Sequence, residues 1–493
     1  MRATTDWLGV HARFRPQAEA LVDLASGRRW TYAAMREQCQ RWAGRLRAEG
    51  VGPGDRVAVL APNRAETLFL LFACAELGAV LLPLNWRLAA PELRWQLEHA
   101  RPRLVLVDPS MSTQLAGVPL DHDPGAVPVE GPGSELGDPW VILYTSGSTG
   151  RPKGAMLTHG QLFHNAVNTQ LACDLGPADS TLTFTPLFHT GGLNCLTTPL
   201  FWRGGRVVLA RGFAAKAALS TIAGERVSLL MGVPTTFQLM ADHADFDGTD
   251  LGSVRDALVG GAALPLPLLR RYRERGIPLR QGFGLTEVGP NCFSMPPAMV
   301  EAKLGSVGLP APGVAARLVR PDGQDCGVDE PGELLLSGPV VFGGYLDDPA
   351  ATQQAMDDGW FRTGDVLARD ADGYHFVRGR IKEMFISGGE NVYPPEVEAA
   401  IHAVEGVVMA AVVGVPDRRW GEAGAAFVQV DPATGPDLAT LRDKLSTMLA
   451  KFKIPRHIWL LPELPVTASA KVDRVVLRAW ALRDAAAQHS GEG

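Results

Sequence analysis

The chain has 493 residues, of which 46% are hydrophobic and 20% are charged, as in an ordinary globular protein. This length exceeds what one hydrophobic core usually serves, so two or more domains are expected. With 47 Lys and Arg against 53 Asp and Glu, the net charge of -6 argues against a general binder of nucleic acids or anionic membranes, which would need a basic excess. Any anionic ligand must therefore be held by a local site.

The cysteines and the most apolar segment indicate a cytoplasmic protein without a membrane span. The six cysteines are far apart and form no CxxC pair, which disfavours zinc and thioredoxin-type sites and favours reduced thiols. The N-terminus lacks the apolar core of a signal peptide. Residues 68–84 are apolar, but a membrane span needs about 20 such residues. We expect a buried helix that runs into a strand there.

Short, continuous apolar runs recur between helical patterns from residue 56 to about residue 360. Continuous runs are typical of strands covered on both faces by helices, which predicts an α/β architecture. A helix is expected after Thr158 as its N-cap, and another should end at Gly276. Residues 109–139 are rich in Pro, Gly and Asp and predict a surface excursion. The predicted strands are residues 56–62, 103–108, 140–146, 206–210, 227–232 and 256–261.

The pattern changes near residue 374. Residues 374–380 and 384–389 are predicted to form a β-hairpin, and residues 394–404 a helix with Pro at its start. Two strands and two further helices follow in the sequence. We therefore expect a large N-terminal domain of helix-covered β-sheets over residues 1–379 and a small α+β domain over residues 380–493.

Residues 144–154, YTSGSTGRPKG, directly follow a predicted buried strand. Backbone N–H groups freed by glycine, together with the hydroxyls of Thr145, Ser146, Ser148 and Thr149, can wrap phosphate oxygens. The spacing differs from GxxxxGK[ST], so the Walker class of NTPase is not supported. Taken alone, the segment fits a phosphate loop or a flexible surface turn.

Five segments, in this order, resemble the signatures of the adenylate-forming superfamily, which includes acyl-CoA synthetases, peptide-synthetase adenylation domains and luciferases. They are YTSGSTGRPKG (144–154), GFGLTE (282–287), WFRTGD (360–365), RGRIKEMFISGGENVYPPEVE (378–398) and PVTASAKVDR (465–474). The resemblance covers nearly the whole chain. It implies an ATP- and magnesium-dependent acid–CoA ligase, which forms acyl-AMP and pyrophosphate and then a thioester with coenzyme A. It also implies a mobile small domain, with a hinge near residues 380–383 at Lys382.

The resemblance assigns the groups closest to the reaction. A carboxylate that approaches a phosphate is repelled, so a cation that bridges both is needed, and the matching residue is Lys471. Glu287 matches the magnesium-binding carboxylate, with Thr145 as a second metal ligand, and Thr286 matches a contact of the α-phosphate. Without the motifs, Lys471 would be an ordinary solvated lysine and Glu287 a surface glutamate. Ala470 replaces the family's usual glycine, which costs about 1 kcal/mol if the turn needs a positive φ.

The remaining ATP contacts are also implied by the resemblance. The adenine-binding residues are Phe283, Gly261 and Ala262, and the ribose-binding residues are Asp365 and Arg380. Core packing is the ordinary alternative for Phe283, and a turn-forming role is the alternative for Asp365. The phosphate-binding residues are Thr145, Ser146, Gly147, Ser148, Thr149, Gly150 and Lys153.

The acyl pocket is implied at the segment TPLFHTGGLN (185–194) and at two later segments. His189 stands where amino-acid-activating relatives carry an aspartate, so a buried substrate ammonium group would be unpaired and amino acids are disfavoured. His189 itself is expected to gate the pocket or to shield the carboxylate, although a hydrogen-bonded core histidine is nearly as good an explanation. A pocket walled by glycine is long or wide, which favours a medium- or long-chain fatty acid over an aromatic acid, while pocket shape discriminates only weakly. The implied lining residues are His189, Gly191, Val233, Gly282 and Gly284.

Coenzyme A is the expected acceptor. The residues implied for it are Gly388 and Gly389 at the pantetheine tunnel and Arg87, Trp420 and Phe452 at the nucleotide. A surface arginine and two partly buried aromatics would explain the last three equally well. An aryl-acid ligase, an enzyme that uses another acceptor, and a non-catalytic nucleotide-binding protein remain alternatives. No nucleic-acid partner is expected, and a homodimer is left open.

Overall fold

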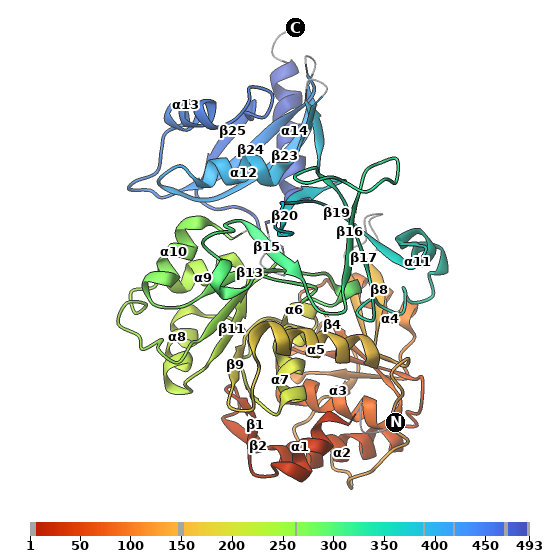
Figure 1. The fold of residues 1–493 in the computed structure, drawn as a ribbon. Helices are drawn as coiled ribbons and strands as arrows, with labels where there is room; N and C mark the ends of the chain where they lie inside the picture. The colour runs from red at the N-terminus through yellow and green to blue at the C-terminus, as the bar shows by residue number, and fades with distance from the viewer. Residues whose placement is uncertain are drawn as a thin grey trace.

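The computed structural model describes residues 6–145, 152–261, 264–387, 390–417, 420–467 and 472–490. Within these residues the strands form three sheets, of fourteen, six and five strands. Figure 1 shows the N-terminal part in red at one end of the molecule and the C-terminal part in blue at the other. In the part of the chain that the structure describes, no helix is long and apolar enough to cross a membrane.

The six-stranded sheet has the order β6-β5-β3-β4-β7-β8, and β8 runs antiparallel to β7. Helix α3 (Ala65–Leu77) precedes β4 directly, which confirms the predicted buried helix that runs into a strand. The helices before and beside this sheet are α1 (Trp7–Phe14), α2 (Tyr32–Ala48) and α4 (Ala90–Ala100). The strands are β3 (Arg56–Leu60), β4 (Val80–Leu84), β5 (Leu104–Val107), β6 (Val118–Pro119), β7 (Pro139–Thr145) and β8 (Lys153–Thr158).

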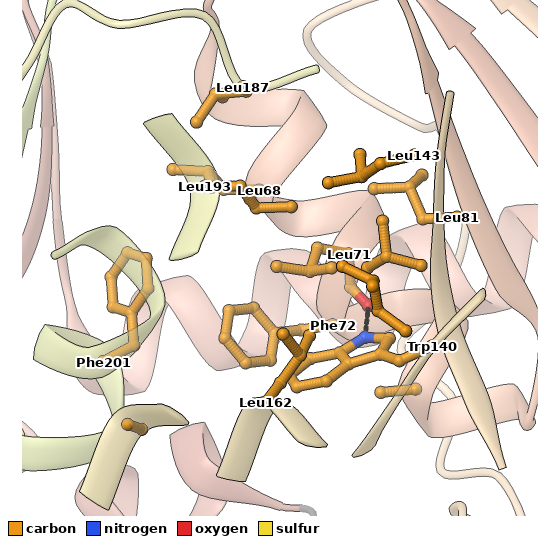
Figure 2. Packing of buried hydrophobic residues seen from close by; sticks show 14 of the residues in the cluster. Leu68, Leu71, Phe72, Leu81, Trp140, Leu143, Leu162, Leu187, Leu193 and Phe201 are labelled. Carbon is orange, nitrogen blue, oxygen red and sulfur yellow. Dashed lines mark hydrogen bonds between the residues drawn. The ribbon is translucent and has the colours of Figure 1, made fainter. Parts of the chain in front are cut away.

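The largest buried hydrophobic cluster surrounds α3. Figure 2 shows Leu68, Leu71 and Phe72 of this helix packed with Trp140 of β7 and with leucines of neighbouring elements. Trp140 is fully buried, and its Nε1–H donates to the carbonyl oxygen of Leu71 at 2.7 Å, so burial leaves no unpaired indole donor. This core fixes β7, the strand that leads into the predicted phosphate loop.

One half of the fourteen-stranded sheet is parallel along β10-β9-β11-β12-β13. Thr158 caps α5 (His159–Cys173) as predicted, because its hydroxyl accepts from the Gln161 N–H at 3.1 Å. The strands are β9 (Ser180–Thr183), β10 (Arg206–Leu209), β11 (Leu229–Gly232), β12 (Asp256–Val259) and β13 (Leu279–Phe283). The other helices of this half are α6 (Thr190–Asn194), α7 (Thr197–Arg203), α8 (Ala215–Gly224), α9 (Pro234–Ala241) and α10 (Leu266–Glu274).

The predicted end of α10 is shifted by two residues. The helix ends at Glu274, and Gly276 follows with a left-handed φ of 73°, the conformation that glycine adopts most easily after a helix. All six predicted apolar strands are present, although the fifth begins at Leu229 instead of residue 227.

The other half of this sheet is antiparallel and ends at the edge strand β16. Near the opposite edge, β1 (Glu19–Asp23) joins β10, and β2 (Arg28–Thr31) completes the sheet. Short 3-10 helices occur at Pro109–Met111, Thr286–Val288 and Pro297–Met299. The strands of the antiparallel half are β14 (Phe293–Ser294), β15 (Ser306–Pro310), β16 (Ala315–Val319), β17 (Gly332–Ser337), β18 (Met356–Asp357), β19 (Trp360–Arg369) and β20 (His375–Arg380), with α11 (Pro349–Ala355) before β18.

The predicted hairpin of residues 374–380 and 384–389 is wrong. Strand β20 pairs with β15 and β19 in the large sheet, whereas β21 (Phe385–Ser387) pairs with β22 (Glu390–Val392) and β24 in the five-stranded sheet. The N–H groups of Glu383 and Met384 donate to the carbonyl of Arg380, so the chain turns before it can continue alongside β20. The chain thus passes from one sheet to the other within residues 381–384, which overlap the hinge expected near residues 380–383.

The five-stranded sheet carries the rest of the C-terminal part. Its order is β22-β21-β24-β23, and β25 also pairs with β24, in parallel. Two hydrophobic clusters cover its two faces, one including Val412 and Phe385 and the other Phe427 and Leu477. The remaining elements are α12 (Pro394–His402), β23 (Val407–Asp417), β24 (Gly421–Val430), α13 (Leu438–Met448), β25 (His457–Leu461) and α14 (Arg474–Ser490).

Candidate active site

The stem of the predicted phosphate loop is fixed by two paired strands. Thr145 is the last residue of β7 and Lys153 the first of β8, and the two are register partners. The loop between them lies outside the described residues, and with it the predicted phosphate contacts Ser146, Gly147, Ser148, Thr149 and Gly150. The described stem places a hydroxyl and an ammonium group at the mouth of this loop.

Glu287 lies against this stem although it comes 142 positions after Thr145. Its side chain is buried, and the Thr145 hydroxyl donates to its Oε1 at 3.4 Å. The Tyr345 hydroxyl donates to the same oxygen at 3.0 Å, and the Lys153 Nζ lies 4.9 Å from the centroid of the Tyr345 ring. The structure therefore brings the two predicted metal ligands together. A carboxylate and a hydroxyl are hard oxygen ligands, so this donor set fits magnesium.

Tyr345 is a site residue that the sequence did not reveal. It lies in the loop after β17, in the segment GGYLDD, which carries none of the recognised motifs. Its backbone N–H is held by the Thr352 hydroxyl at 2.9 Å, which fixes the ring beneath Lys153. Thr286, the neighbour of Glu287, is half-buried, and its carbonyl accepts from Gln161 Nε2 at 3.2 Å.

Asp365 and Arg380 form the second part of the site. They are register partners on β19 and β20, and Arg380 Nε donates to Asp365 Oδ1 at 2.8 Å. Asp365 is only 4% exposed, and its Oδ2 has no hydrogen-bond partner among the residues that the structure describes. Burial raises the pKa of Asp365, although the Arg380 guanidinium acts to lower it. An unpaired buried acceptor is costly, so this oxygen fits a ligand that donates hydroxyl groups, as a ribose does.

The predicted adenine contacts lie at neighbouring strand ends. Gly261 follows β12 with a φ of 80°, and Phe283 ends β13, the adjacent parallel strand. Ala262 lies outside the described residues. Phe283 is half-buried and meets Phe293 edge to face, with 5.8 Å between ring centroids. The carboxyl ends of parallel strands meet at one edge of a sheet, where α/β proteins commonly bind ligands.

The predicted acyl-pocket residues lie at the same edge. His189 is the N-cap of α6, and its Nδ1 accepts from the Gly191 N–H at 3.1 Å. Val233 follows β11 and is the N-cap of α9. Met231 of β11 was not singled out from the sequence, yet its Cε lies 3.1 Å from the point where a Gly191 Cβ would be. A partly exposed methionine on a central strand thus faces the His189 segment.

The three glycines that predicted a wide pocket have different reasons to be glycine. A Cβ on Gly284 would lie 2.3 Å from the Pro290 carbonyl oxygen, so this position requires glycine for backbone packing. A Cβ on Gly191 would be tight against Met231. Among the described residues, a Cβ on Gly282 would meet only the Phe293 carbonyl oxygen, at 3.8 Å. Only Gly282 therefore leaves room that a side chain could fill.

The predicted coenzyme A and hinge residues are spread over both parts of the chain. Arg87 is exposed beside the six-stranded sheet, with its Cζ 4.7 Å from the Trp86 ring centroid. Trp420 and Phe452 are half-buried near the five-stranded sheet, and the Trp420 N–H donates to Asp417. Lys382 is exposed in the turn after β20. The other predicted residues, Gly388, Gly389, Ala470 and Lys471, lie outside the described residues.

Two family models match the chain. The AMP-binding enzyme model matches residues 9–346, and the AMP-binding enzyme C-terminal domain model matches residues 396–471. The chain is 42% identical to a feruloyl-CoA synthase of Amycolatopsis sp over 94% of this chain and 96% of the relative. It is 39% identical to an indoleacetate–CoA ligase of Aromatoleum aromaticum, over 95% and 96%. A long-chain-fatty-acid–CoA ligase of Mycobacterium tuberculosis is 33% identical, over 96% and 97%.

Solved structures share the fold over nearly the full length. An anthranilate CoA ligase in complex with anthranoyl-AMP has a TM-score of 0.91 at 28% identity, over 98% of both chains. An o-succinylbenzoate coenzyme A synthetase of Bacillus subtilis, in complex with ATP and magnesium ion, has a TM-score of 0.86 at 31% identity, over 95% of this chain and 98% of the other.

Proposed function

The chain belongs to the AMP-binding enzyme family, and from this premise we propose that it activates an aromatic carboxylic acid for transfer to coenzyme A. It is an acid–thiol ligase of the AMP-forming type, and it uses ATP, Mg²⁺ and coenzyme A.

The observation that supports the site assignment best is the convergence on Glu287. The stem residues Thr145 and Lys153 meet Glu287 and Tyr345 from distant segments, and Asp365 on β19 offers a carboxylate oxygen without a partner among the described residues. The charge of Glu287 also acts on Asp365 and helps to raise its pKa. One cluster can thus hold the phosphate and ribose ends of a nucleotide.

The described residues suggest how the first step is supported. Lys153 would neutralise the departing phosphates, and the paired hydroxyls of Thr145 and Tyr345 would hold Glu287 in one orientation for a metal ion. Bound magnesium would supply charge neutralisation on the phosphate oxygens. Asp365 would accept the ribose hydroxyls and fix the nucleotide. The carboxylate and the α-phosphate repel each other, so the bridging cation that we assign to Lys471 would complete the site.

Two observations favour an aromatic acid over the fatty acid that the glycines predicted. Relatives at 42% and 39% identity carry the names feruloyl-CoA synthase and indoleacetate–CoA ligase. Gly284 is explained by close backbone packing and lends no support to a long pocket, and a Cβ on Gly191 would be tight against the Met231 side chain. A medium- or long-chain fatty acid remains the second candidate, because Gly282 leaves open space and one relative is a long-chain-fatty-acid–CoA ligase.

The test is acid-dependent exchange of radiolabelled pyrophosphate into ATP. We expect exchange with arylpropenoic or arylacetic acids at a higher kcat/KM than with fatty acids of similar length. A preference for the fatty acids would reverse the order of the two candidates. If none of the acids supported exchange, the proposed chemistry would be contradicted. When coenzyme A is added, the acid should be converted into its coenzyme A thioester, and AMP should be released.

Lys471→Ala tests the bridging cation separately. This variant should lose exchange while it binds ATP with nearly unchanged affinity, because the proposed lysine acts on the reacting pair and the other contacts remain. Lys382→Ala, at the proposed hinge, is the matched control for removal of a lysine and should retain exchange. Normal exchange by Lys471→Ala would refute the assignment.

A further inference from the structure

A partly buried ion pair lies just beyond the segment that carries Lys471. Arg474 is the first residue of α14, and its Nη1 and Nη2 donate to Glu398 Oε1 and Oε2 at 2.6 and 2.9 Å. Glu398 belongs to α12, and only 13% of its side chain is exposed. A bidentate arginine–carboxylate pair fixes direction as well as distance.

The pair also bonds to the edge strand β23 of the five-stranded sheet. Strand β23 ends the order of this sheet, and at Val412 its outer N–H and C=O face the pair. The Val412 N–H donates to Glu398 Oε1 at 2.7 Å, and Arg474 Nη1 donates to the Val412 carbonyl at 2.8 Å. Three elements that lie together in Figure 1, α12, β23 and α14, are therefore joined at one point.

Arg474 has no favourable role as part of its own helix. A positive charge at a helix N-terminus opposes the helix dipole, so the first position of α14 is a poor place for arginine. Asp473 caps the helix instead, because its Oδ1 accepts from the N–H groups of Val475 and Val476 at 3.1 Å each. The contacts of Arg474 with Glu398 and Val412 thus explain the arginine better than the stability of its own helix does.

What it holds is the stem of the segment with Lys471. Val466 and Val472 form an antiparallel bridge, and the Asp473 N–H donates to the Pro465 carbonyl at 2.8 Å. The chain therefore leaves at Val466 and returns at Val472 with its ends joined, and Arg474 anchors the returning end two residues later. Lys471, the residue directly before this returning end, lies outside the described residues.

The other side of Arg474 faces the segment where we place the hinge. Its Nε lies 3.8 Å from Glu383 Oε2, and the Glu383 N–H donates to the Arg380 carbonyl at 3.1 Å. Arg380 in turn holds Asp365 of the proposed ribose site. Two ion pairs, Asp365–Arg380 and Glu383–Arg474, are thus linked through the backbone hydrogen bond between Glu383 and Arg380, and they connect the ribose carboxylate to the stem.

We propose that Arg474 and Glu398 are positioning residues for the adenylation step, which hold in place the stem that flanks the segment with Lys471. The inference rests on the proposed function for the role of Lys471, and on the described contacts for the anchoring. A displaced stem moves the bridging cation away from the reacting pair, and displacement of a reacting group by about 1 Å can cost about 100-fold in rate.

The variants Glu398→Gln and Arg474→Lys keep much of the side-chain shape and break the bidentate pair. We expect pyrophosphate exchange to fall about 10- to 100-fold in kcat, with the KM for ATP changed less than about twofold. Thioester formation from supplied acyl-adenylate and coenzyme A should stay within about twofold of wild type, because the lysine is assigned only to the first step. Glu396→Gln, on the same helix but paired with Lys453 instead, is the matched control and should leave exchange unchanged.

Hydrogen–deuterium exchange gives a readout that does not depend on activity. In both variants the amide of Asp473 should exchange faster, while the amides between β23 and β24 stay protected. Equal loss of both half-reactions, unchanged pyrophosphate exchange, or an unchanged Asp473 amide would overturn the inference. If none of the acids tested supported pyrophosphate exchange by the wild type, the proposed function would fail. The amide measurement would still decide whether the pair anchors the stem.

Discussion

The unpaired oxygen of Asp365 makes one substitution especially informative. In Asp365→Asn, the side-chain carbonyl can still accept from Arg380, while the amide nitrogen replaces Oδ2 and donates where the carboxylate accepted. A hydrogen bond to a charged group contributes about 1.5–3 kcal/mol. Loss of this acceptor should therefore weaken ATP binding by about 10- to 150-fold.

The same substitution should leave the unliganded protein as stable or make it more stable. Burial raises the pKa of Asp365, so the folded state disfavours its charged form. When the pKa of a carboxyl group is raised in the folded state, the protonated group contributes fully to folding stability below the unfolded pKa of 3.8. This contribution is lost as pH rises through the folded pKa. At neutral pH the wild-type carboxylate thus costs stability, and the neutral amide removes that cost.

Calorimetry can measure both effects. Isothermal titration should show weaker binding of ATP to Asp365→Asn, and the variant should no longer distinguish ATP from its 2′-deoxy and 3′-deoxy analogues. Thermal unfolding without ATP should give an equal or higher Tm, with a smaller rise on addition of ATP. Asp370→Asn removes a carboxylate that pairs with Lys303 near the end of β19, and it serves as the control. ATP affinity within about twofold of wild type for Asp365→Asn would refute our reading of the unpaired oxygen.

Three further predictions follow from single contacts. Tyr345→Phe removes one of the donors to Glu287, so the apparent KM for magnesium–ATP should rise about fivefold, and an unchanged value would deny Tyr345 this role. Gly282→Val should fold normally and lose activity on the bulkiest acids first, whereas Gly284→Ala should lower the Tm. If the two variants changed the activity and the Tm equally, the packing argument would be contradicted. Burial lowers the pKa of His159 to about 4, so unfolding measured between pH 6.5 and 4 should show stability that falls as pH falls, and His159→Phe should flatten this slope.

Local signals in the sequence were sufficient for most elements. Continuous apolar runs became buried strands, and the Thr158 hydroxyl caps α5, because both depend on neighbours within a few residues. The hairpin at residues 374–389 failed because two extended segments that are adjacent in sequence need not pair. The turn at Glu383 sends them to different sheets, and no local pattern distinguishes that turn from a hairpin loop.

The site was predictable only where a motif marked it. Thr145, Glu287 and Asp365 lie in recognised segments. The structure brings Thr145 and Glu287 into contact, while the roles of all three stay predictions. Tyr345 and Met231 were missed because their importance comes from segments that approach only in the folded chain. Glycine was ambiguous in another way, because the same residue serves close backbone packing at position 284 and leaves open space at position 282.

The burial of every cysteine has a practical consequence for an enzyme that consumes a thiol. All six cysteines are free and buried, and burial raises the pKa of each thiol, so little thiolate forms at neutral pH. The folded protein should therefore form no mixed disulfides with its own co-substrate. A chromogenic disulfide reagent added to a running reaction should report the loss of coenzyme A alone, and the enzyme should contribute colour only when it unfolds.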